Sequence, residues 1–124
     1  SRNPYVYAHT STDFLNLIQR VEDIARDHPD QKDMLIKIIT RPDEAWPLPW
    51  YLRGFTRVGY WQEADEAGMV RDVPVVISSV DETEGLLTEL QESHQSEFFG
   101  LRPEVLLAVH IRKDLWEKFL EGRR

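Results

Sequence analysis

The chain has 124 residues, the length of one domain, and its 41% hydrophobic and 30% charged residues are typical of a globular protein. It carries 22 acidic against 15 basic residues, a net charge of −7, which argues against nucleic acid or an anionic membrane surface as the main partner, because both attract clustered basic residues. It has no cysteine, so disulfides and thiolate metal sites are excluded.

The first third of the chain predicts a strand, a helix and a second strand. Residues 5–8 are strand formers, and the polar residues after them offer several helix caps: Thr10 with Asp13 at capping-box spacing, or Ser11 or Thr12. The helix then shows one apolar stripe: Phe14, Leu17, Ile18, Val21, Ile24 and Ala25. Pro29 ends it, and the apolar residues 34–40 form the second strand. This order favours a right-handed crossover with parallel pairing.

The middle of the chain is dominated by residues 41–55, RPDEAWPLPWYLRGF. Two prolines separated by one residue cannot lie in a helix interior or a central strand. We predict a short helix with Pro47 or Pro49 in its first turn and Gly54 at its C-terminal cap. Residues 58–61 then form a third strand.

The rest of the chain continues the alternation of strands and helices after an acidic loop over residues 62–72. The expected elements are a strand over 73–79, a helix capped by Asp81, an extended segment over 97–101, a strand over 105–111 and a helix that opens at Asp114 and stops at Gly122. We therefore predict a small three-layer α/β domain that is Rossmann-like. Its central sheet would have about five mostly parallel strands, with one or two antiparallel strands near the end and helices on both faces.

Polar and aromatic residues gather where the predicted strands end and in the adjoining 41–55 stretch. In open α/β sheets, ligands bind outside the carboxyl ends of the strands. We therefore expect one ligand-binding or docking site made of ten residues: His9, Thr10, Asp43, Glu44, Trp46, Trp50, Tyr51, Arg53, Tyr60 and Trp61. The rings would offer a stacking platform for sugars, whereas the competing interpretation is that each ring packs in a core.

Other chemistries lack support in the sequence. Asp43 and Glu44 are neighbours that point apart, so a structural or ligand-binding role is favoured over acid/base catalysis. No two histidines stand at helical metal-ligand spacing, so we expect no metal site, and His28 is interpreted as a favourable charge at a helix end. The chain has no Gly-x-Gly-x-x-Gly or Walker loop, so no cofactor is expected. A free-standing hydrolase is the weakest interpretation, because no nucleophile, base and orienting group can be assembled.

Residues 43–55 and 58–61 carry a family resemblance. They resemble the signature of the soluble C-terminal region of flippase-activity-associated proteins of archaeal N-glycosylation type. These are polytopic membrane proteins in the wider protein mannosyltransferase and ArnT-like superfamily, of the GT-C glycosyltransferase type. Residues 3–10 resemble the start of that region, and three further stretches resemble its end: 99–103, 105–108 and 112–116.

The resemblance implies that the chain is the C-terminal extramembrane domain of a longer membrane protein, on the extracytoplasmic side. The transmembrane region of the same protein would then be a partner of this domain. The absence of a Met at the start of the sequence agrees with a fragment. The family's catalytic carboxylates would lie in the membrane part. We therefore expect a non-catalytic accessory domain that helps bind or orient a glycan, a lipid-linked sugar or an acceptor. The alternative is a structural domain that docks on its own membrane part or on a partner protein.

Overall fold

The computed structural model describes residues 11–122, so the predicted first strand and the predicted site residues His9 and Thr10 lie outside the described part. The helices are α2 (Thr12–Asp27), α3 (Pro42–Ala45), α4 (Leu48–Tyr51), α5 (Val80–Leu90) and α6 (Lys113–Gly122), with short 3-10 turns η1 (Gln31–Asp33) and η2 (Ala64–Ala67). The strands are β1 (Ile36–Ile39), β2 (Val58–Trp61), β3 (Val75–Ser79), β4 (His94–Arg102) and β5 (Val105–Arg112).

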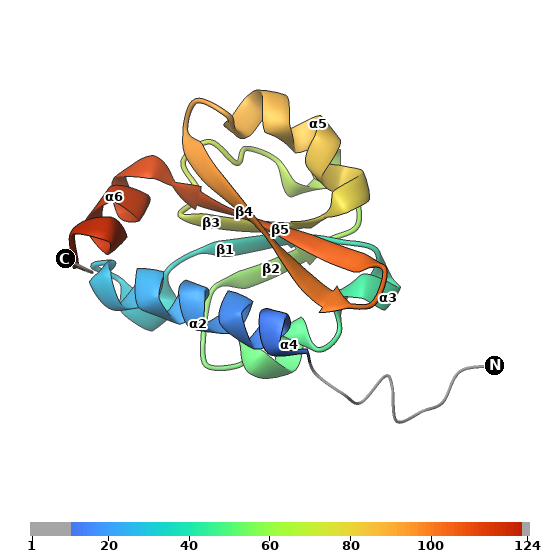
Figure 1. The fold of residues 1–124 in the computed structure, drawn as a ribbon. Coiled ribbons are helices and arrows are strands. Elements are labelled where there is room, and N and C mark those ends of the chain that lie inside the picture. Colours follow the sequence, from blue (N-terminus) through green and yellow to red (C-terminus); the bar gives the residue numbers. More distant parts are fainter. Residues whose placement is uncertain (1–10, 123–124) are drawn as a thin grey trace.

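The five described strands form one mixed sheet in the order β2-β1-β3-β5-β4 (Figure 1). Strand β1 pairs in parallel with β2 and β3, whereas β5 pairs antiparallel with both β3 and β4. The predicted α/β class is confirmed, but the prediction of a mostly parallel sheet is wrong. The reason is the tight turn at Pro103 and Glu104, which joins β4 to β5 as a hairpin and leaves no room for the crossover that parallel strands require.

The strand residues alternate between two hydrophobic clusters. Ile36, Ile38 and Ile77 pack with the apolar stripe of α2 and with α6, whereas Ile39 and Val76 pack with residues of α5 and η2. Figure 1 shows α2 and α5 on opposite sides of the sheet. All six predicted stripe residues of α2 are buried, so the helical periodicity of the sequence is confirmed.

The N-terminus of α2 is held by Ser11, one of the predicted caps. Its hydroxyl accepts a hydrogen bond from the Phe14 N–H at 3.0 Å and donates to the Gly100 carbonyl of β4 at 2.8 Å. The carboxylate of Asp13 accepts from the Gly100 N–H at 2.5 Å. These bonds attach the start of α2 to the edge strand β4, so the cap also fixes the packing of the helix on the sheet.

The 41–55 stretch forms two short helices instead of the predicted one. The helical conformation is interrupted between α3 and α4, where the Trp46–Pro47 peptide bond is cis. Helix α4 has a proline in its first turn as expected, but its C-terminal cap is Leu52 and not Gly54. Asp81 and Asp114 lie one residue inside α5 and α6 and are therefore not the caps that the sequence indicates.

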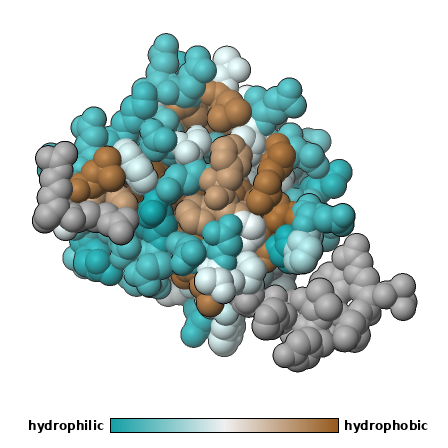
Figure 2. Space-filling model, in the orientation of Figure 1, coloured by the Kyte–Doolittle hydropathy of each residue, from teal (hydrophilic) through white to brown (hydrophobic). Residues whose placement is uncertain are grey.

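One face of the molecule exposes an apolar patch where α5 meets the β4–β5 hairpin. We call it the hairpin patch, and it consists of Val80, Leu87, Phe98 and Leu106, which are between 38% and 54% exposed. Figure 2 shows hydrophobic side chains gathered on this face. Phe98 and Leu106 have the same strand parity as His110, which is linked to Thr83 of α5 through the Ser78 hydroxyl, so both residues lie on the α5 side of the sheet.

Candidate functional site

Glu44 of α3 belongs to a network of ion pairs at the carboxyl ends of β1 and β3, and its neighbour Asp43 accepts a hydrogen bond there through its backbone. The Arg41 guanidinium lies 3.7 Å from the Glu44 carboxylate and 3.4 Å from that of Asp81, which follows β3. Arg102 donates a hydrogen bond to the Asp43 carbonyl at 2.6 Å. Burial, and after it the nearby charge of Asp43, raises the pKa of Glu44 above its ordinary value. These contacts give Asp43 and Glu44 a structural role, which is to connect α3 with α5 and with the β4–β5 hairpin.

The aromatic residues of α4 point in different directions. The Trp50 side chain is 54% exposed, and the Arg53 guanidinium stacks on its ring at 3.8 Å from the centroid while donating to the Trp50 carbonyl at 2.7 Å. Tyr51 turns inward instead and meets the Phe14 ring edge-on at 5.4 Å. Trp46, at the end of α3, is 57% exposed.

Trp50 and Arg53 border a cleft of about 400 Å³ between α2 and α4, which we call the α2–α4 cleft. Its lining residues are Ile18, Glu22, Lys32, Trp50, Tyr51, Arg53 and Gly54. Lys32 lies 3.7 Å from Glu22, and its ammonium group lies 4.2 Å from the centre of the Phe55 ring. The cleft therefore combines an exposed aromatic ring with two cations and one carboxylate.

The aromatic pair on β2 borders a second cleft, which we call the β1–β2 cleft, of about 440 Å³. Tyr60 is 42% exposed, and partial burial raises the pKa of its hydroxyl. Trp61 is half-buried against the α5-side cluster, with the Lys37 ammonium 5.3 Å from its ring. A Cβ atom on Gly59 would lie 2.3 Å from the Trp61 ring, so this ring position requires glycine two residues before it.

The structure thus distributes seven of the eight described candidates over three places, and the eighth, Trp46, is exposed at the end of α3. Glu44 joins the ion-pair network and the Asp43 carbonyl bonds to Arg102 beside it. Trp50, Tyr51 and Arg53 line the α2–α4 cleft, and Tyr60 and Trp61 line the β1–β2 cleft. The Arg53 guanidinium stacks on the exposed Trp50 ring. Whether these residues bind a ligand stays a prediction.

A buried polar network around His110 has only one sequence signal, a single histidine in the apolar stretch 105–111. Its Nε2 lies 3.0 Å from the Ser78 hydroxyl and its Nδ1 lies 2.6 Å from the Ser96 hydroxyl, while Ser78 contacts the Thr83 hydroxyl at 2.7 Å. Burial, and secondarily the charge of His94, lowers the pKa of His110 to about 4. Because His110 is fully buried, this Ser–His contact serves the core and cannot reach a substrate.

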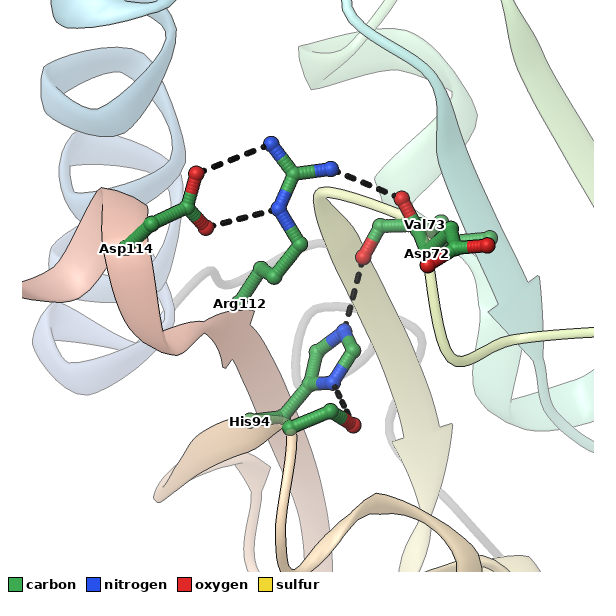
Figure 3. Close-up of polar contacts among 6 residues, drawn as sticks. Asp72, Val73, His94, Arg112 and Asp114 are labelled. Carbon is green, nitrogen blue, oxygen red and sulfur yellow. Dashed lines mark hydrogen bonds and ion pairs between the residues drawn. The ribbon is translucent and has the colours of Figure 1, made fainter.

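A second polar cluster lies at the start of β3, and Figure 3 shows its contacts. Arg112 donates to both carboxylate oxygens of Asp114, at 2.7 and 3.2 Å, and to the Asp72 carbonyl at 2.8 Å. The hydrogen bond from Arg112 lowers the pKa of Asp114. The His94 Nε2 lies 2.7 Å from the Val73 carbonyl, and burial lowers the pKa of this ring. The cluster ties the segment before β3 to β4, β5 and α6.

His28 does not act as the expected charge at a helix end. It does lie at the C-terminal cap of α2, but it is buried, and its Nδ1 accepts a hydrogen bond from the Asp30 N–H at 3.0 Å. Burial lowers the pKa of this ring, so the neutral form is present at pH 7.

Within residues 11–122, no group of three or more histidine or carboxylate side chains is placed to hold a metal ion. No helix in this part of the chain combines the length and apolar character of a membrane span. Comparisons with models of protein families, with curated proteins and with solved structures gave no match.

Proposed function

We propose that the chain is a non-catalytic accessory domain of a membrane glycosyltransferase-like protein, built in three α/β layers. It would help to bind or orient a glycan, a lipid-linked sugar or an acceptor. The observation that carries this proposal is the exposed Trp50 ring, which Arg53 holds in place beside the α2–α4 cleft. A ring that is already ordered loses little conformational entropy when a sugar stacks on it.

The setting of the domain is supported by the resemblance of residues 43–55 and 58–61 to the C-terminal signature of the membrane protein family. Under this proposal, the domain stands on the extracytoplasmic side beside its own transmembrane region. Reactive groups would come from the membrane part, because the Glu44 carboxylate of α3 is paired with Arg41 and no nucleophile accompanies the carboxylates of α3.

The test is an NMR titration of the 124-residue chain with short glycans and sugar phosphates. The signals to follow are the four indole N–H groups, those of Trp46, Trp50, Trp61 and Trp116. We expect saturable shifts for tryptophans of the 41–61 region and none for Trp116, which packs on the Phe119 ring in α6 and is the internal control. No shift with any sugar at about millimolar concentration, the weak end of specific binding, would refute ligand binding.

A docking function is the second candidate, and the hairpin patch favours it. Contiguous exposed apolar side chains on a surface mark interaction sites. Under this alternative, the double change Phe98→Ser and Leu106→Ser should abolish co-purification of the chain with its separately expressed transmembrane region. Leu15→Ser on α2, at a comparable exposure of 45%, is the matched control and should leave co-purification intact.

A further inference from the structure

We infer that the α2–α4 cleft binds a phosphorylated sugar, with the pyranose ring against Trp50 and the phosphate between Arg53 and Lys32. The inference rests on the proposed function and specifies the ligand class of the same region. It follows from three properties of the cleft: an exposed ring, two cations from different elements, and a single carboxylate.

The ring surface needed for a sugar is present at Trp50. The Arg53 guanidinium occupies a position 3.8 Å from the ring centroid, yet more than half of the Trp50 side chain remains exposed. The hydrogen bond from Arg53 Nη1 to the Trp50 carbonyl uses only part of the guanidinium, which has five N–H groups. The remaining donors have the planar fork geometry that suits phosphate oxygens.

Lys32 supplies the second cation from a different element of the cleft lining. It belongs to η1, and the Lys32 carbonyl accepts a hydrogen bond from the Thr56 N–H at 2.9 Å, which joins its backbone to the segment after α4. Its ammonium lies over the Phe55 ring and 3.7 Å from Glu22. This ion pair is exposed, with side chains 54% and 40% accessible, so it contributes little and leaves the ammonium open to an anion.

The charge balance distinguishes this cleft from the β1–β2 cleft. The chain as a whole has a net charge of −7, yet the α2–α4 cleft presents Lys32 and Arg53 against Glu22 alone. The lining of the β1–β2 cleft contains the carboxylate of Glu66 and no lysine or arginine. An anionic ligand is therefore favoured in the first cleft and disfavoured in the second.

Phosphate and sugar should be required together. Both cations are exposed, so each charge contact with phosphate is screened by solvent and is weak alone. Stacking of a sugar on one indole is also weak alone. A ligand that carries both groups makes the two contacts at the entropic cost of one association, and the Glu22 carboxylate can accept a hydrogen bond from a ring hydroxyl.

The experiment compares four probes in titrations of the 124-residue chain, followed through the Trp50 indole N–H signal. The probes are a hexose 1-phosphate, the methyl glycoside of the same hexose, inorganic phosphate, and the methyl phosphodiester of the hexose phosphate. We expect the hexose 1-phosphate to bind at least about tenfold tighter than either the glycoside or inorganic phosphate, the equivalent of one charge-assisted hydrogen bond. Equal binding of the phosphodiester would support a lipid-linked source, and its failure to bind would support a free sugar phosphate.

Three variants test the assignment of the phosphate. Arg53→Gln and Lys32→Gln should each weaken the hexose phosphate about tenfold while leaving the methyl glycoside unchanged within about twofold. Lys32→Gln is informative even if Arg53→Gln loosens the Trp50 ring, because Lys32 does not contact that indole. Arg57→Gln removes an exposed arginine outside the cleft lining and is the matched control, with an expected change below about twofold.

Two results would overturn the inference alone, and a third would overturn it together with the proposed glycan binding. If the glycoside and the hexose phosphate shift Trp50 with equal affinity, the phosphate assignment is wrong while glycan binding stands. If Arg57→Gln weakens binding as much as Arg53→Gln, the effect is one of net charge and the cleft is not the site. If no probe shifts Trp50, both the inference and glycan binding fail.

Discussion

Acidification should destabilise the fold through His110. Its ring is fully buried between β3, β4 and α5, and both ring nitrogens face hydroxyls, those of Ser78 and Ser96. A neutral imidazole donates a hydrogen bond through one nitrogen and accepts one through the other, and a hydroxyl group can act as either acceptor or donor. Protonation would place a charge in the core with no carboxylate among these hydrogen-bond partners, so burial lowers the pKa to about 4 from an ordinary 6.5.

The sign and size of the effect follow from linkage between proton binding and folding. Between pH 6.5 and about 4, the unfolded chain binds a proton at His110 and the folded chain does not, so the free energy of unfolding falls as the pH falls. The contribution of the neutral His110 ring to the free energy of unfolding is fully present above pH 6.5. At about 1.4 kcal/mol for each pKa unit, it amounts to about 3 kcal/mol, of which about 2 kcal/mol is lost by pH 5. A domain of this size is stable by about 5 to 15 kcal/mol, so the loss is measurable.

The contribution of His110 can be measured by urea unfolding at pH 7.5 and at pH 5. The experiment compares the natural chain with the variant His110→Gln. Glutamine does not titrate, so the natural chain should lose about 2 kcal/mol more than the variant between these pH values. His28 and His94 are present in both chains, and their contributions largely cancel in the comparison. Equal losses, or an NMR titration that places the His110 pKa near 6.5, would refute the reasoning.

Two further predictions test local packing and local charge. Gly59→Ala should destabilise the fold by about 1 to 3 kcal/mol because its Cβ would collide with the Trp61 ring, as measured by urea unfolding. Gly85→Ala, in α5 with open space around the added Cβ, is the control and should stabilise the fold by up to about 1 kcal/mol. Arg112→Gln should raise the pKa of Asp114 toward its ordinary value, because the hydrogen bond that lowers it is lost, and a ¹³C NMR titration of the carboxyl carbon would show this. In the natural chain, the stabilisation from Asp114 is present above the ordinary carboxyl pKa and disappears as the pH falls through the lowered one.

Local patterns in the sequence were sufficient to predict the elements whose burial follows one periodicity. The stripe of α2 is buried as expected, and β2 occupies residues 58–61 as expected. The direction of the strands was harder to predict from the sequence. A mostly apolar run such as β5 shows the same residue pattern in a parallel pair as in an antiparallel pair. The direction depends on the length of the connection to β4, and the turn at Pro103 and Glu104 is too short for a crossover.

The candidate site shows where sequence proximity ceases to predict spatial proximity. The spacing of Trp46 and Trp50 places them on one side of a helix only if the helix is continuous, and the chain breaks between them at Pro47. On β2, alternation sends Trp61 toward the α5 side and Tyr60 to the other face. Conversely, Lys32 stands far from Arg53 in sequence and belongs to the turn before β1, yet both line the α2–α4 cleft. Two cations that only the fold brings together are therefore the basis of the proposed anion binding in this cleft, and no spacing within residues 41–55 could have indicated them.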